Sequence, residues 1–241
     1  MITVRTRRTN DSPFMPATAT TVHSMFVKIC GVTSEDDALL AVALGADAIG
    51  FIFAPSSRQI AVQKVYDITR RLPPEILTVG VFKDAHPSRV VEMVQSAGVK
   101  AAQLHGHESP DDVLAISKHV RFVIKAVTAG TVDASRANQF NTDYILVDSA
   151  SPGSGQVFDW SLVVNVPEVP KLILAGGLTP DNVAEAITAV KPWGVDVASG
   201  VEASPGKKDP LAMKRFIETA KSAAPEPHRG PDTMPYDWTD E

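Results

Sequence analysis

Eight short apolar runs recur along this chain, and each is followed by a segment of helical character. A strand–helix alternation predicts a parallel sheet, because parallel neighbours need a helical crossover between them. Eight such units within residues 26–222 predict a closed (β/α)8 barrel, the TIM barrel. An open doubly wound sheet is the alternative, but no GxGxxG follows the first run. The runs are residues 27–31, 48–53, 77–82, 101–106, 121–127, 144–149, 171–177 and 194–200.

Several helix boundaries can be predicted from capping residues. Ser34 with Asp37 resembles an N-cap with an acidic first turn, and Leu44-Gly45 is placed to end that helix. The helix after the sixth run must be short, near residues 159–165. Proline is tolerated in a first helical turn, which is where we expect Pro87, Pro110 and Pro180.

The two ends of the chain differ from the middle. Residues 1–25 are rich in Thr, Arg and Ala and lack the apolar core of a secretory signal. We interpret them as a disordered extension or the product of a start codon upstream of Met25, with an arginine-rich transit peptide as the alternative. Residues 223–241 are rich in proline and acidic side chains, which predicts a disordered tail.

Composition narrows the classes of function. Hydrophobic residues make up 44% of the chain, enough for a sizeable core, and the net charge of -5 indicates no nucleic-acid partner. No apolar run reaches the roughly 18 residues of a membrane span, so we expect no membrane partner. The single cysteine excludes an internal disulfide and fits a reducing, cytoplasmic location.

Functional groups of such barrels lie where the strands end and in the loops that follow them. Two glycine-containing turns, Gly176-Gly177 and Ser199-Gly200, close the seventh and eighth runs, and the loops there are the usual phosphate site of this barrel. Glycine lets backbone N–H groups approach an anion closely, which predicts a phosphate site. The alternative is that the glycines only form two tight turns and bind nothing. The other candidates at these positions are Cys30, the loop 54–58, His105, Asp148 and the loop 151–160.

Asp148, Arg58 and Cys30 each have two interpretations at this stage. Asp148 shares a strand face with Leu146 and is expected to point to the barrel mouth, or it caps its own loop. Arg58 can bind a carboxylate bidentately, or it is an ordinary surface arginine. Cys30 is either a small buried core residue or a chemical group.

Lys28 is an unexpected lysine in an apolar run. It has the same parity as Cys30, so it should point inward one layer deeper, where a buried ammonium needs a partner. We predict an ion pair with Asp196 of the eighth strand, or a contact with ligand. Gln103 and His105 also share a face, and because His105 and His107 have no evident third ligand, we expect no metal.

A set of motifs in order resembles one enzyme family. The chain contains KICG, FIFAPSSRQI, GVF, QLHG, Asp148 followed by GSGQVFDW, LAGGL and DVASGVE. Together they strongly resemble the phosphoribosylanthranilate isomerases of tryptophan biosynthesis, and the likeness covers nearly all of residues 26–222. Each motif alone would be weak.

The resemblance implies an Amadori rearrangement of N-(5-phosphoribosyl)anthranilate without a cofactor. It implies Cys30 as general base, Asp148 as general acid and Arg58 on the anthranilate carboxylate. The partner would be this small phosphosugar substrate, and the protein a monomer or homodimer. The glycine turns would hold the phosphate. The residues expected to contact substrate are Arg58, Lys28, Gln103, His105, Gly155, Gly176, Gly177, Asp196, Ser199 and Gly200.

The chain departs from the family motif at one position, and two alternative functions remain. Pro152 replaces the first glycine of the loop after Asp148, which stiffens a hinge and affects loop closure. The first alternative is another phosphosugar barrel enzyme, such as ribulose-phosphate epimerase or aminoimidazole-carboxamide isomerase. The aminoimidazole-carboxamide isomerase would have an aspartate where Cys30 stands. A non-enzymatic barrel is the other, and the intact site residues argue against it.

Overall fold

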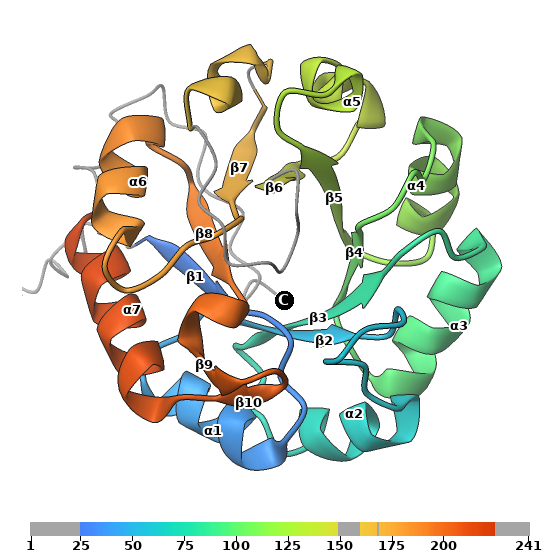
Figure 1. The fold of residues 1–241 in the computed structure, drawn as a ribbon. Coiled ribbons are helices and arrows are strands. Elements are labelled where there is room, and N and C mark those ends of the chain that lie inside the picture. The colour runs from blue at the N-terminus through green and yellow to red at the C-terminus, as the bar shows by residue number, and fades with distance from the viewer. Residues whose placement is uncertain (1–24, 149–159, 168, 225–241) are drawn as a thin grey trace, which may run out of the picture.

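A computed structural model describes residues 25–148, 160–167 and 169–224 and confirms the predicted barrel (Figure 1). Its parallel strands close in sequential order, so that the first pairs with both the second and the eighth. The strands are β1 (Phe26–Ile29), β2 (Ala48–Ile52), β3 (Leu77–Phe82), β4 (Ala101–Leu104), β5 (Phe122–Thr128), β6 (Tyr144–Asp148), β7 (Lys171–Leu174) and β8 (Gly194–Val197).

Helices surround the barrel, and a small hairpin follows β8 (Figure 1). The α-helices are α1 (Glu35–Ala43), α2 (Val62–Thr69), α3 (Pro87–Ala97), α4 (Pro110–Ser117), α5 (Val132–Ser135), α6 (Val183–Val190) and α7 (Pro210–Ser222). The 3-10 helices are η1 (Ala137–Phe140), η2 (Trp160–Asn165) and η3 (Ser199–Val201), and the hairpin pairs β9 (Glu202–Ser204) with β10 (Lys207–Lys208). The short η2 follows β6 as the sequence predicted. No described helix has the length and apolar character needed to cross a bilayer.

Most predicted helix boundaries are confirmed. The Ser34 side chain accepts a hydrogen bond from the Asp37 amide at 3.1 Å, and Leu44 ends the helix. Pro87 and Pro110 occupy first-turn positions of α3 and α4. The prediction for Pro180 is wrong, because α6 begins only at Val183. The side chain of Asn182 accepts from the Thr179 amide at 2.8 Å and closes a turn ahead of the helix.

The barrel extends slightly beyond its predicted limits. Met25, assigned above to the extension, is only 3% exposed and belongs to the core. Ala223 caps α7, and Ala224 packs against the same core. The rest of the predicted extension and tail, residues 1–24 and 225–241, lies outside the described residues.

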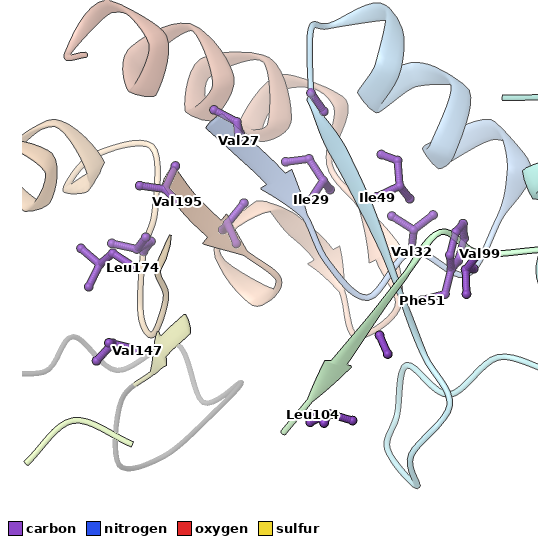
Figure 2. Packing of buried hydrophobic residues seen from close by; sticks show 14 of the residues in the cluster. Val27, Ile29, Val32, Ile49, Phe51, Val99, Leu104, Val147, Leu174 and Val195 are labelled. Carbon is purple, nitrogen blue, oxygen red and sulfur yellow. The ribbon is translucent and has the colours of Figure 1, made fainter. Parts of the chain in front are cut away.

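Alternation along the strands separates two cores. Val27 and Ile29 of β1 join the cluster that includes buried residues of the surrounding helices, beside Ile49 of β2 and Val195 of β8 (Figure 2). Phe26 belongs instead to the cluster inside the barrel. The even-numbered positions of β1 therefore face the interior, as the parity argument required.

Candidate active site

Cys30 and Lys28 both point into the barrel beside Gly50 of β2. A Cβ placed on Gly50 would lie 2.8 Å from the Cys30 Sγ and 3.1 Å from the Lys28 Nζ. Cys30 is the first residue after β1, and its amide donates to the Val197 carbonyl of β8 at 2.8 Å. Glycine at position 50 thus leaves the space that these two side chains occupy at the end of β1.

The predicted ion pair between Lys28 and Asp196 is confirmed. The two residues are register partners on β1 and β8, and Lys28 Nζ lies 2.9 Å from Asp196 Oδ1. The lysine is fully buried and the aspartate is 7% exposed. Burial by itself would lower the pKa of Lys28, but Asp196, with a smaller contribution from Cys30, raises it, so the ammonium stays charged.

Replacing Lys28 by methionine is expected to destabilise the barrel by about 3 kcal/mol, because Asp196 would be left buried without its partner. The double variant Lys28→Met/Asp196→Asn should recover part of this loss. Urea unfolding would measure both. The control is Lys221→Met, whose pair with Asp47 is partly exposed and should be worth about 1 kcal/mol or less. Equal losses in the two single variants would contradict the prediction.

Burial raises the pKa of the Cys30 thiol above its ordinary range, and the Lys28 ammonium opposes only part of the rise. Asp196 adds to it, whereas Lys208 lowers it slightly. Lys28 therefore favours the thiolate, but its effect on the pKa of Cys30 does not overcome that of burial.

A raised pKa at Cys30 predicts that the reactivity of its thiol rises with pH. Because only the thiolate is nucleophilic, the rate of alkylation by iodoacetamide should increase about tenfold per pH unit from pH 6 until the limb levels off above the free-thiol value of about 8.5. With one cysteine in the chain the label is unambiguous. A limb that levels off below pH 7 would contradict the raised pKa.

Asp148, at the end of β6, contacts His105 of the β4 loop. His105 Nε2 lies 3.2 Å from Asp148 Oδ2, and Gln103 Nε2 lies 3.0 Å from His105 Nδ1. With Gln103 as donor to Nδ1, a neutral ring carries its proton on Nε2, the nitrogen nearest to Asp148. Gln103 is 1% exposed, so it supports His105 from below. The contacts of Gln103 and His105 with substrate stay predictions.

The loop that carries His105 is held by a buried ion pair that the sequence analysis missed. Lys125 Nζ lies 2.7 Å from Glu108 Oε2 and donates to the Gly106 carbonyl at 2.6 Å. Glu108 also accepts from the Asp84 amide at 2.9 Å. The available signal was a lysine inside the apolar fifth run, the same feature that singled out Lys28. On β5 it points outward, since Ile124 and Ala126 line the interior.

The two glycine turns lie against each other. A Cβ on Gly200 would stand 1.9 Å from the Leu178 carbonyl oxygen, so no other residue fits there without displacing backbone. Gly176 and Gly177 have φ of 87° and 67°, which favours glycine. Ser199 and Gly200 do not end the strand as expected, because β8 stops at Val197 and they begin η3.

This arrangement leaves backbone donors available. Among the described residues, the amides of Gly176 and Gly177 donate no hydrogen bond. Asn182 Nδ2 donates to the Gly177 carbonyl at 2.9 Å, which holds the turn next to the start of α6. A turn with free N–H groups near a helix N-terminus can bind a phosphate.

Arg58 is neither exposed nor unpaired. A Cβ on Gly31, whose φ is 71°, would lie 2.7 Å from the Arg58 Cδ, so the side chain runs past the residue that follows Cys30. Its Nε and Nη2 donate to the two carboxylate oxygens of Glu202 at 2.8 and 2.7 Å. The surface alternative is therefore wrong. Glu202 also was missed, although it directly follows the glycine turn in DVASGVE.

Two residues named in the sequence analysis, Pro152 and Gly155, lie outside the described residues. Among the residues that are described, no three His, Cys, Asp or Glu side chains are grouped so as to hold a metal ion.

Comparisons with known proteins agree on one family. The family model of N-(5'-phosphoribosyl)anthranilate (PRA) isomerase matches residues 27–219. The isomerase of Desulforudis audaxviator is 45% identical, covering 82% of this chain and 98% of its own. The crystal structure of the Thermotoga maritima enzyme is 43% identical with a TM-score of 0.77, covering 82% and 99%. A relative solved with reduced 1-(o-carboxyphenylamino)-1-deoxyribulose 5-phosphate is 41% identical with a TM-score of 0.75, with the same coverage.

Proposed function

Because the chain belongs to the N-(5'-phosphoribosyl)anthranilate isomerase family, we propose that it converts N-(5'-phosphoribosyl)anthranilate to 1-(2-carboxyphenylamino)-1-deoxyribulose 5-phosphate. The observation that carries the proposal is the order of groups at one end of the barrel. Cys30 follows β1, Asp148 ends β6, and the glycine turns follow β7 and β8 between them. A phosphosugar anchored at those turns would lie between the two side chains.

Asp148 acts first, as a general acid. The ribose ring opens when its ring oxygen gains a proton from the Asp148 carboxyl and the bond between this oxygen and C1' breaks. The anthranilate nitrogen supplies the electron pair, which leaves a protonated Schiff base at C1'. The contact of His105 Nε2 with Oδ2 at 3.2 Å would orient the carboxyl group, so that Oδ1 can face the sugar.

Cys30 acts next, as a general base. The positive Schiff base acidifies the proton on C2', and the Cys30 thiolate removes it to give an enolamine. The enolamine then tautomerises: O2' loses a proton and C1' gains one, which gives the ketone. The reaction is therefore an isomerisation in which no atom is gained or lost, and no cofactor is needed to balance it.

Binding is divided between the two ends of the substrate. Arg58 would hold the anthranilate carboxylate, and Gly176, Gly177, Ser199 and Gly200 the phosphate. Lys28 and Asp196 pair one layer below Cys30 and would act on the thiol rather than on the sugar.

Complementation tests this function. Expression of the chain in a tryptophan auxotroph that lacks the isomerase should restore growth without tryptophan. The purified protein should convert the substrate without added metal or cofactor. Growth that depends on tryptophan despite folded protein in the cell, together with no turnover in vitro, would overturn the proposal.

We also infer a monomer or homodimer located in the cytoplasm. The enzyme of Thermotoga maritima has been described as dimeric, with monomers generated from it. The single cysteine suits a reducing compartment. Sedimentation equilibrium would decide the oligomeric state, and cell fractionation the location.

A further inference from the structure

Glu202 occupies only one edge of the Arg58 guanidinium. An arginine carries five N–H donors in a planar fork. Glu202 accepts from Nε at 2.8 Å and from Nη2 at 2.7 Å, which uses two of them. Glu202 is the only described residue that accepts a hydrogen bond from this side chain. The Nη1–Nη2 edge therefore retains the donors needed for a second, bidentate carboxylate.

Glu202 is itself held in place. Its Oε1 lies 3.1 Å from the Lys208 Nζ and 3.3 Å from the Gly206 amide, and its side chain is 4% exposed. Lys208 is buried and also donates to the Ala198 carbonyl at 2.9 Å. Glu202, Gly206 and Lys208 belong to the β9–β10 hairpin, which follows η3 and lies on the α1 and α7 side of the barrel (Figure 1). The hairpin thus fixes Glu202, and Glu202 fixes Arg58.

The cluster of Arg58, Lys208 and Glu202 has more basic than acidic side chains. It contains two basic groups, Arg58 and Lys208, and one carboxylate. Burial lowers the pKa of Lys208, and Glu202 opposes only part of this change. Burial would raise the pKa of Glu202, but its bonds with Arg58 and Lys208 hold it below the ordinary range, so it stays ionised. A substrate carboxylate would balance the second positive charge.

We propose that Glu202 is the positioning residue for recognition of the substrate's aromatic carboxylate. It holds the Nε–Nη2 edge of Arg58 so that the opposite edge is presented to the ligand. This inference rests on the proposed function, in which Arg58 binds that carboxylate. The opposite possibility is that Glu202 competes with the ligand for Arg58, and the two possibilities predict effects of opposite sign.

Glu202→Gln separates them, because glutamine keeps the size but accepts from only one of the two N–H groups and carries no charge. Calorimetry would compare reduced 1-(o-carboxyphenylamino)-1-deoxyribulose 5-phosphate with its phenylamino counterpart, which lacks the carboxylate. We expect about tenfold weaker binding of the first ligand, the loss typical of one charge-assisted hydrogen bond, and at most about a twofold change for the second. KM should rise while kcat changes little.

Three results would overturn the inference. Tighter binding of the carboxylated ligand would make Glu202 a competitor, equal weakening of both ligands would make it merely structural, and no change would leave it without a role in binding. If Glu202→Gln does not fold because Lys208 is left unpaired, Glu202→Gln/Lys208→Met gives the same comparison. Glu35→Gln is the matched control, since Glu35 pairs with Arg71 at the surface at 2.8 Å.

The Arg58→Ala variant distinguishes this inference from the function on which it rests. Arg58→Ala should abolish the preference for the carboxylated ligand, and Glu202→Gln should have no further selective effect in that background. If Arg58→Ala keeps the preference, the role of Arg58 fails and the inference fails with it. If Arg58→Ala loses the preference for the carboxylated ligand but Glu202→Gln keeps it, the role of Arg58 stands and only the role of Glu202 fails.

Discussion

Cys30→Ala is expected to fold normally and to lose about 10³-fold to 10⁴-fold in kcat, the contribution of a well-placed general base. Alanine keeps the fold because it fits the small space beside Gly50. The change removes the single thiol of the chain, which is the group proposed to take the C2' proton. Reduced 1-(o-carboxyphenylamino)-1-deoxyribulose 5-phosphate should still bind, since the glycine turns proposed to hold its phosphate and Arg58 are unchanged. Steady-state kinetics and calorimetry would measure the two effects.

Val27→Ala is the matched control for Cys30→Ala. Val27 lies on the same strand but packs outward (Figure 2), so this change should lower stability by about 1–3 kcal/mol while leaving kcat within about a factor of three. Cys30→Ser tests the chemistry separately, because a hydroxyl is similar in size but a much weaker acid. Turnover close to that of the unmodified protein in either Cys30 variant would remove the thiol from the mechanism.

Asp148→Asn is expected to lower kcat by about 10²-fold to 10⁴-fold. The asparagine side chain has the same size and can place its oxygen at the same position, so the contact with His105 Nε2 at 3.2 Å is retained. It has no acidic proton to give to the ring oxygen, so ring opening would become limiting. A substrate analogue that is already open-chain should lose much less, and comparing the two in a single-turnover assay would assign the step.

The control for Asp148→Asn is another aspartate beside a histidine. Asp84 Oδ1 lies 3.3 Å from His107 Nδ1, but this pair is largely exposed, so Asp84→Asn should change kcat by no more than about twofold. Equal losses at both positions would indicate a general effect on the neighbouring loops. Activity preserved in Asp148→Asn would exclude this carboxyl as the acid.

Features that depend on position along a single strand could be predicted from the sequence. Side chains alternate in a strand, so the inward direction of Lys28 and Cys30 followed from the apolar residues between them. Barrel closure then made β1 and β8 neighbours, and Lys28 and Asp196 became register partners. Both steps use only local periodicity and the order of strands.

The contacts between loops could not be predicted in this way. Arg58 and Glu202 meet across 144 positions of the chain, and neither lies on a barrel strand. The contact of His105 with Asp148 likewise depends on a loop held by Glu108 and Lys125. Loop conformation depends on tertiary hydrogen bonds, for which the chain carries no period.

The sequence by itself determined the barrel, its interior parity and the residues available for acid, base and phosphate binding, because these depend on the alternation of strands and helices and on motif order. Only the tertiary structure decided the state of each group. It buried Cys30 beside Lys28 and thereby raised the pKa of its thiol. It also paired Arg58 with Glu202. Burial and long-range pairing are properties of the packed molecule, since each requires segments that are distant in the chain to come together and exclude water.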